Sequence, residues 1–157
     1  MSNISTAYGA IKTKMEALFP IGSGYIQLVN PYDIDENTDS ALKLGWGIAL
    51  NSGTNTRREL SCRLSLERTI TITFTRARYR SEFNTSQQET NEKLLFEDQY
   101  LLIKDLENEP MINNATSGIV KFTFESDGGV ESVTGESDAY IKLSSIFSLE
   151  YFENLQP

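Results

Sequence analysis

The chain has 157 residues, of which 39% are hydrophobic, and a formal net charge of −8 at pH 7. Residues 1–157 therefore fit a single domain with an ordinary buried core, and the negative charge disfavours a general nucleic-acid-binding surface. The sequence shows no secretory signal pattern and no apolar run near the roughly 20 residues of a membrane span, so we expect a soluble, unsecreted protein without membrane contact.

The first predicted element is an amphipathic helix from Asn3 to Leu18, which ends before Pro20. Its apolar residues recur every three or four positions, as they do on the buried face of a helix. A short strand is expected over residues 25–29. The next segment, residues 30–40, is rich in turn-forming residues and predicts a loop.

This loop contains the only metal-like spacing in the sequence, which is formed by Asp33, Asp35, Asn37 and Asp39. These residues occupy positions one, three, five and seven of an EF-hand-like calcium loop. The glycine expected at position six and the glutamate expected at position twelve are missing. We therefore assign no metal and no cofactor. The loop is interpreted as polar surface or as an acidic patch for a partner's arginines, with calcium binding left open.

Alternating apolar residues predict a strand over residues 42–50, with Trp46 on its buried side. A lone tryptophan on the apolar side of a strand is more often core than a binding platform. On the other side, Gly45, Gly47 and Ala49 are small enough for another backbone or subunit to approach closely. Residues 51–56 then predict the loop of a hairpin.

Residues 60–80 form the longest alternating segment, with mostly apolar side chains at even positions up to Phe74 and polar ones at odd positions. This pattern predicts a long strand at the sheet centre whose even-numbered side, including Cys62, lies in the core. At about 3.3 Å per residue, the strand would span roughly 50–65 Å, more than a small domain is wide. Either this segment bends into two strands or its far end projects, and we expect the far end, with Arg76, Arg78 and Arg80, to project as an arm.

A second amphipathic helix is predicted from about Ser86 or Thr90 to Asn108, and a β-hairpin fills the final third of the chain. Residues 120–124 and 141–151 alternate as its strands, and residues 127–129 supply a turn or a bulge. This order predicts an α+β fold. We expect a mainly antiparallel sheet of about five strands, two helices packed on one face, and a long projecting β-hairpin arm. The opposite, threonine-rich face suits water or a neighbouring subunit's sheet.

Charge is distributed unevenly along the chain. Residues 1–81 carry ten basic and seven acidic side chains, whereas residues 82–157 carry four basic and fifteen acidic ones. All seven arginines lie between Arg57 and Arg80. Two interpretations stay open. The first is an ordinary solvated surface, and the second is a homo-oligomer in which the arginine arm of one copy meets the acidic face of the next.

The residue types of common catalytic sites are scarce in this sequence. It contains no histidine, its single cysteine is expected to be buried without a basic partner, and no nucleotide-binding glycine motif follows a strand. Acidic pairs such as Glu97 and Asp98, or Asp33 and Asp35, are candidates for carboxylate catalysis. We predict that the protein is not an enzyme, with an enzyme that uses only carboxylates as an alternative.

The order and lengths of the predicted elements carry a resemblance that covers nearly the whole chain. They comprise the N-terminal helix, the loop Asn30-Pro31-Tyr32-Asp33, the tryptophan-containing strand, Arg57-Arg58-Glu59 at the start of a β arm, the second helix, and a closing hairpin whose last strand is Ala139 to Phe152. Together they resemble the tail terminator, or tail completion, proteins of long-tailed bacteriophages.

This resemblance implies an α+β subunit of a hexameric ring on the last ring of the tail tube protein. The ring stops tail polymerisation and offers a surface to the head-tail connector in the neck. Its implied ring or axial interface residues are Asp33, Asp35, Asp39, Arg57, Arg58, Arg76, Arg78 and Arg80. The protein would be a virion component assembled in the host cytoplasm. A negatively charged ring would let DNA pass through its lumen without specific binding.

Other functions stay open from the sequence. Among virion proteins, the chain could also be a neck or head-completion protein or a tail tube subunit. A tube subunit polymerises into an open-ended tube, whereas a terminator forms a closed ring and stops polymerisation. From another class, a small-ligand-binding α+β module would hold its ligand between helix and sheet. Such a module is expected to be a monomer whose melting temperature depends on ligand.

Overall fold

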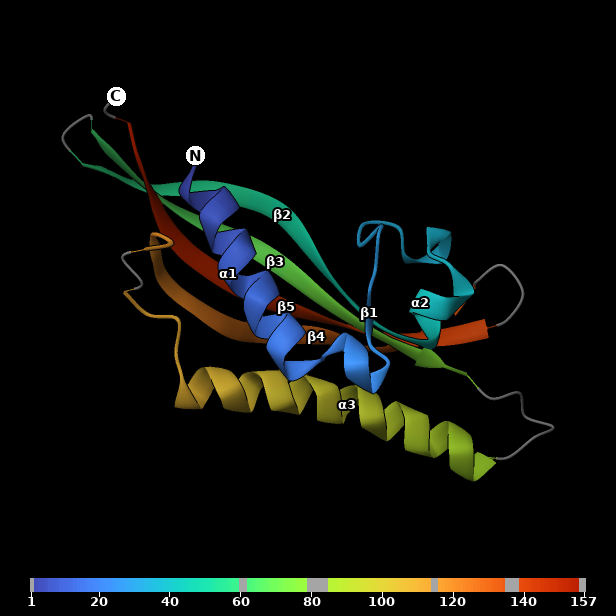
Figure 1. Cartoon of the computed structure of the whole chain (residues 1–157). Helices are drawn as coiled ribbons and strands as arrows, with labels where there is room; N and C mark the ends of the chain where they lie inside the picture. Colours follow the sequence, from blue (N-terminus) through green and yellow to red (C-terminus); the bar gives the residue numbers. More distant parts are fainter. Residues whose placement is uncertain (1, 60–61, 79–84, 114–115, 135–138, 156–157) are drawn as a thin grey trace.

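A computed structural model of the chain shows a twisted sheet flanked by helices (Figure 1). The structure describes residues 2–59, 62–78, 85–113, 116–134 and 139–155. Its elements are α1 (Asn3–Leu18), η1 (Ile21–Ser23), β1 (Ile26–Gln27), η2 (Ile34–Glu36), α2 (Asp39–Lys43), β2 (Leu44–Glu59), β3 (Arg63–Ala77), α3 (Thr85–Asn108), β4 (Ile119–Thr134) and β5 (Ala139–Asn154).

The sheet has five strands in the order β1-β2-β3-β5-β4. Strand β1 pairs with β2 in parallel, and the other three pairings are antiparallel. Strand β3 is central, because β2 lies along one side of it and β5 pairs with it from Arg63 to Ala77 on the other. The predicted α+β fold with a mainly antiparallel sheet is therefore confirmed.

The main core lies between the sheet and the helices α1 and α3. Even-numbered residues of β3 face it, and Ile70, Ile72 and Phe74 are completely buried. Trp46 of β2 lies opposite Phe74 in the register and is 2% exposed, which confirms its predicted place in the core. Burial of such large apolar side chains is the dominant favourable term in folding. This layer fixes both helices on one face of the sheet.

The N-terminus of α1 is tied to the last strand. The Glu153 carboxylate of β5 accepts the backbone N–H groups of Asn3 and Ile4, at 2.8 and 3.0 Å. These N–H groups have no partner within the helix, and the helix dipole favours negative charge at this end. Residues Ala7, Ile11 and Met15 then place one buried side chain per turn against the sheet.

The other face of the sheet is partly covered by the segment between β1 and β2. There Leu28, Ile34, Ala41, Leu42, Val133 and Tyr140 form a second buried cluster. Thr73 and Thr75 are buried on this face, and the Thr75 hydroxyl donates to the Ala41 carbonyl at 3.4 Å. We expected this threonine-rich face to contact water or a neighbouring subunit's sheet, but at this end of the sheet it is covered by the chain's own α2.

Two sequence expectations about the β2–β3 hairpin are wrong. Residues 51–56 are not its loop, because β2 continues to Glu59 and absorbs the turn-forming residues as register shifts at Leu50/Gly53 and Asn55/Arg57. Glycine and asparagine mark bulges as readily as turns, so the hairpin is longer than expected. Cys62 consequently lies after the strand, half-buried near the hairpin turn, instead of in the central core.

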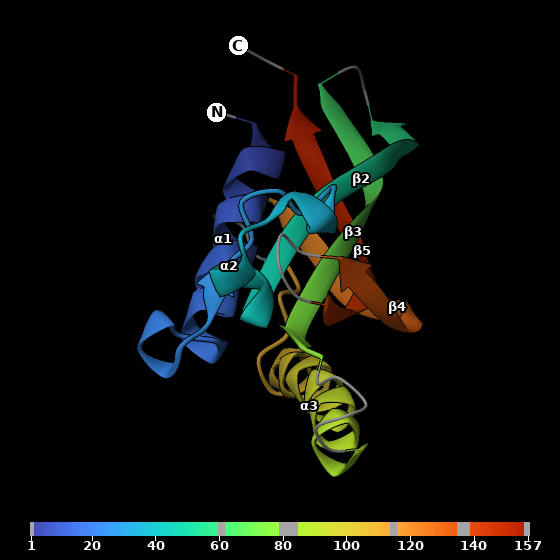
Figure 2. The ribbon, with the colours of Figure 1, turned by 90° about the vertical axis from the view of Figure 1, so that its right-hand side faces the viewer.

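The hairpin does project, but from its other end. The strands β2 and β3 run past the N-terminal end of α1 at the upper left of Figure 1, and Figure 2 shows the same extension from the side. The end of β5 pairs with β3 along this part, from Tyr151 opposite Leu66 to Asn154 opposite Arg63. We call the end of the hairpin, residues 54–59 and 63–66, the arm. The opposite end of β3, with Arg76, lies over α3. The expectation that the Arg76 end projects is therefore wrong.

Candidate functional site

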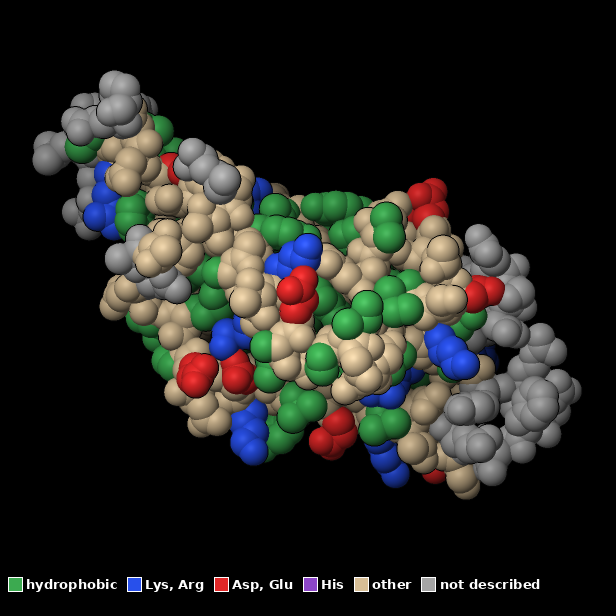
Figure 3. Space-filling model, in the orientation of Figure 1, with side chains coloured by type: hydrophobic (Ala, Val, Ile, Leu, Met, Phe, Trp, Pro, Cys, Tyr) green, Lys and Arg blue, Asp and Glu red, His purple; other side chains and the backbone are tan. Residues whose placement is uncertain are grey.

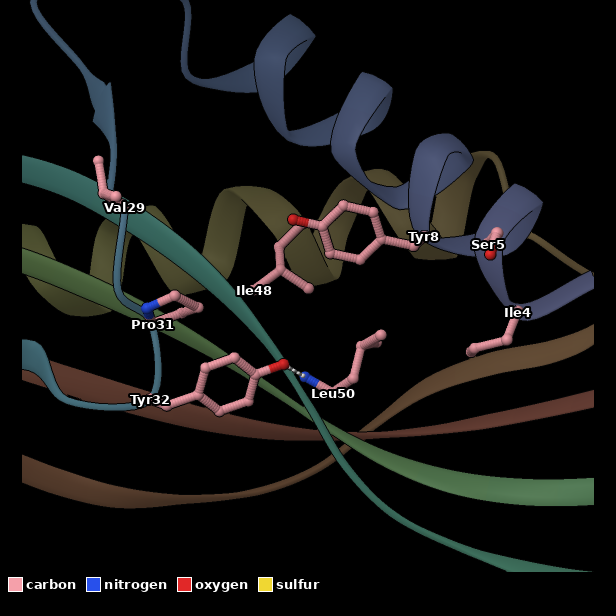
Figure 4. Close-up of a pocket in the computed structure, with 8 residues that line it drawn as sticks. All are labelled: Ile4, Ser5, Tyr8, Val29, Pro31, Tyr32, Ile48 and Leu50. Carbon is pink, nitrogen blue, oxygen red and sulfur yellow. Dashed lines mark hydrogen bonds between the residues drawn. The ribbon is translucent and has the colours of Figure 1, made fainter. Parts of the chain in front are cut away.

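An apolar groove lies beside the outer edge of β2, between α1 and the loop that follows β1. It has a volume of about 440 Å³ and is lined by Ile4, Ser5, Tyr8, Val29, Pro31, Tyr32, Ile48 and Leu50. Figure 4 shows these side chains and the hydrogen bond that the Leu50 N–H donates to the Tyr32 hydroxyl, at 3.3 Å. We call this hollow the edge groove, because it lies at the root of the arm.

Large hydrophobic side chains stand out into solvent around the edge groove. Val29 is 92% exposed and Tyr32 68%, and both line the groove. Figure 3 shows hydrophobic side chains gathered over α1 and the loop that follows β1. Single exposed apolar residues are common on proteins, but a group of them rimming a groove marks an interaction site.

Asn37 holds the wall of the edge groove in place. Its side chain is 3% exposed, and its carbonyl oxygen accepts the Asn30 N–H at 2.9 Å. Its amide group donates to the carbonyls of Asn30 and Ile34, at 2.8 and 3.1 Å. Because one buried side chain satisfies several backbone groups of the loop, Val29 and Tyr32 are presented from an ordered segment and not from a loose one.

The three aspartates of the predicted acidic loop are placed separately. Asp33 is exposed and precedes η2, Asp35 is exposed within η2, and Asp39 lies half-buried in the first turn of α2. The amide of Asn37 points into the loop, so the EF-hand-like spacing does not converge on one point. In the part of the chain that the structure describes, no group of three or more acidic, cysteine or histidine residues could hold a metal ion.

Four of the predicted interface arginines, Arg57, Arg58, Arg76 and Arg78, lie on or beside the hairpin. Arg57 and Arg58 are in the last part of β2, opposite Ser65 and Leu64 of β3. Arg78 is exposed just after β3. Arg80 lies outside the described residues. The structure therefore places Arg57 and Arg58 in the arm and Arg78 at the opposite end of the same strand pair.

Arg76 is used within the chain. Its guanidinium makes an ion pair with the Asp98 carboxylate of α3, with 3.0 Å between Nη2 and Oδ2, and also donates to the Tyr25 hydroxyl at 3.2 Å. The Tyr25 hydroxyl in turn donates to Asp98 at 2.9 Å. The Arg76 side chain is 15% exposed and that of Asp98 4%. Arg76 is thus a clamp between the sheet and α3, and its assignment to an intersubunit interface stays a prediction.

Burial shifts the acid–base properties of this cluster. It raises the pKa of the Asp98 carboxyl above its ordinary value, against the opposing effect of the Arg76 charge and the hydrogen bonds from Tyr25 and Arg76. Burial and the nearby Asp98 carboxylate also raise the pKa of the Tyr25 hydroxyl. Sequence reasoning missed Tyr25 and Asp98 as partners. One feature of the sequence could have indicated a buried ion pair here: Arg76 is a charged residue at an even-numbered, core-facing position of the strand.

The two members of the acidic pair Glu97 and Asp98 lie in different environments. Asp98 is buried against Arg76, whereas Glu97 is exposed on the outer side of α3. Among the described residues, the arrangement with the clearest chemical meaning is therefore the exposed edge groove beside the arm, which suits binding of another chain.

No protein-family model matches the chain, and no characterised protein shows significant sequence similarity to it. Across the described residues, the helices are all too short or too polar to cross a bilayer.

Proposed function

We propose that this chain is a structural virion protein that forms a closed ring on the end of a phage tail tube. In this proposal the ring ends tail polymerisation and provides the surface to which the head-tail connector binds. The observation that carries the proposal is the edge groove, an exposed apolar surface at the root of a projecting arm. A surface of this kind serves assembly with another protein chain better than it serves catalysis.

The charge of the chain supports the same function. The net charge of −8 gives a ring of several copies a strongly negative overall field, which repels the phosphates of duplex DNA. DNA would then pass through the lumen without specific binding. The basic residues Arg57 and Arg58 are concentrated in the arm, where they can meet acidic surface on a neighbouring subunit.

A small-ligand-binding module is the second candidate function. The edge groove falls within the roughly 300–1,000 Å³ typical of ligand sites, and the hydroxyls of Tyr8 and Tyr32 lie among its apolar residues. This alternative predicts a monomer whose melting temperature rises with an added ligand. If the chain instead forms a ring, we expect it to self-associate without any added small molecule.

Negative-stain electron microscopy of the purified protein tests the proposed function. We expect closed rings of uniform diameter with an open centre, and we expect these rings to leave duplex DNA unbound at physiological salt. Long open tubes would instead indicate a tube subunit. Retention of duplex DNA on the ring would contradict the proposal that the genome passes through the lumen without binding.

A further inference from the structure

Both outer edges of the sheet are open in the described part of the chain. On one side, β1 and the Tyr32 hydroxyl cover the edge of β2 only as far as Leu50, and no described strand pairs with that edge from Asn51 to Glu59. On the other side, β4 is the last strand. Unpaired strand edges carry free N–H and C=O groups that bind another strand unless the protein blocks them.

Only residues 51–56 of the free β2 edge lack the usual blocking residues, because the last three residues, Arg57, Arg58 and Glu59, are charged. Residues 51–56 contain no lysine, no proline and no charged side chain. Monomeric proteins commonly protect such an edge with these residue types. The two bulges in β2 bend this edge, so a flat strand would fit it poorly and a curved strand would fit it better.

The free edge of β4 has an apolar groove of its own. This α3–β4 groove has a volume of about 450 Å³ and is lined by Ile103, Leu106, Glu107, Pro110, Ile112, Phe122, Thr123 and Phe124. Ile112 is 50% exposed, and the adjacent Asn113 N–H binds the Val120 carbonyl at the start of β4. Strand β4 is also curved, with three register shifts against β5. Each open edge thus combines a bulged strand with an apolar groove.

The two edge strands carry opposite charge. Strand β4 has one lysine, Lys121, and three acids, Glu125, Asp127 and Glu131. The open part of β2 has Arg57 and Arg58 and a single acid at its end, Glu59. Opposite net charges on the two edge strands steer the encounter of two copies, whereas two β2 edges or two β4 edges would bring like net charges together.

We propose that the β2 edge of one copy binds the β4 edge of the next copy, so that the sheet continues from subunit to subunit. The apolar surface around Ile112 of one copy would cover the edge groove around Val29 of its neighbour. Such a contact is heterologous, since it uses two different surfaces at opposite edges of the sheet, and repeated rotation closes it into a ring. This inference rests on the proposed ring function and names the surfaces that form the ring.

The test uses one charged substitution in each groove. Val29→Asp and Ile112→Asp each place a carboxylate where the proposed contact buries apolar surface, and both sites are at least half exposed in the single chain. We expect each variant to fold with a wild-type circular dichroism spectrum and to lose ring formation, with self-association weakened by at least about tenfold. Tyr100→Asp is the matched control: Tyr100 is 55% exposed on α3 and lines neither groove, so this variant should form rings.

Mixing the two variants then identifies the surfaces as partners. A Val29→Asp copy keeps an intact β4 edge and an Ile112→Asp copy keeps an intact β2 edge, so an equimolar mixture should form a heterodimer and nothing larger. Analytical ultracentrifugation of the separate and mixed variants measures this. Rings formed by either variant alone, or a mixture that stays monomeric, would overturn the inference while the ring proposal stands. A wild-type chain that is monomeric even at millimolar concentration would overturn both.

Discussion

Replacement of Arg76 by methionine is expected to lower the free energy of unfolding by about 3–5 kcal/mol, measured by urea denaturation. The substitution removes the cation that faces Asp98 and leaves the carboxylate buried, with a side chain that is only 4% exposed. A buried charge without its partner is among the few single changes that destabilise a protein this strongly. The Tyr25 hydroxyl still donates to Asp98, but one neutral donor does not replace the charge.

The dependence of this loss on pH follows from the pKa of Asp98. Burial raises that pKa in the folded state, so the folded chain binds the proton more readily than the unfolded chain does. The carboxylate therefore costs stability above its folded pKa, and the cost disappears as the pH falls through that value. Arg76→Met removes the opposing effect of the guanidinium and raises the pKa further. The deficit of the variant is thus expected to be largest at neutral pH and to shrink on acidification.

Two further variants make this prediction specific. Arg78→Met removes an exposed arginine two residues away and should change stability by no more than about 0.5 kcal/mol. Adding Asp98→Asn to Arg76→Met removes the buried charge and should recover part of the loss. An Arg76→Met protein as stable as the wild type at neutral pH would show that the clamp between β3 and α3 does not contribute to folding.

Substitution of Gly45 by alanine is expected to cost about 3 kcal/mol of unfolding free energy. A Cβ atom at this position would lie 2.2 Å from the Ala41 carbonyl oxygen and 2.8 Å from the Thr75 hydroxyl. The carbonyl belongs to the backbone of α2 and cannot rotate away, so α2 must move off the sheet. Because α2 holds the second buried cluster together, the loss should include that cluster, with Leu42 becoming accessible.

Gly9→Ala provides the control for Gly45→Ala. Gly9 is exposed in α1, and an added Cβ there meets no atom within 4 Å. Alanine is the better helix former, so this variant should be more stable than the wild type by up to about 1 kcal/mol. If Gly45→Ala unfolds at the same urea concentration as Gly9→Ala, then α2 does not pack against β2 as described.

The helices and strands were predictable because apolar residues recur at one regular spacing within each of them. The alternation of Ile70, Ile72 and Phe74 with threonines predicted the buried side of the central strand, and the structure confirms it. The three- and four-residue spacing in α1 and the glycine-marked irregularity at residues 127–129, where β4 is bulged, were likewise local signals. Periodicity reports which side of an element is buried, and that is enough to assign the fold class.

The candidate site depended on features that no local pattern contains. Tyr25, Arg76 and Asp98 come from three separate segments, so the sequence could mark Arg76 as a charged residue on a core-facing side but could not name its partners. The edge groove forms because the loop around Val29 packs beside β2, and its exposed residues resemble ordinary core residues in the sequence. The direction of the arm was wrong because residues 51–56 form bulges where a turn was expected.

The mass of the wild-type assembly, measured by native mass spectrometry at low and at moderate salt, decides whether the chain forms a closed ring. We expect one closed species, a hexamer of the 17.7 kDa chain, that dissociates toward the single chain as salt screens the contacts between the arginine arm and the acidic β4 edge. A single-chain mass under every condition, or an open-ended series of increasing masses, would contradict a closed ring.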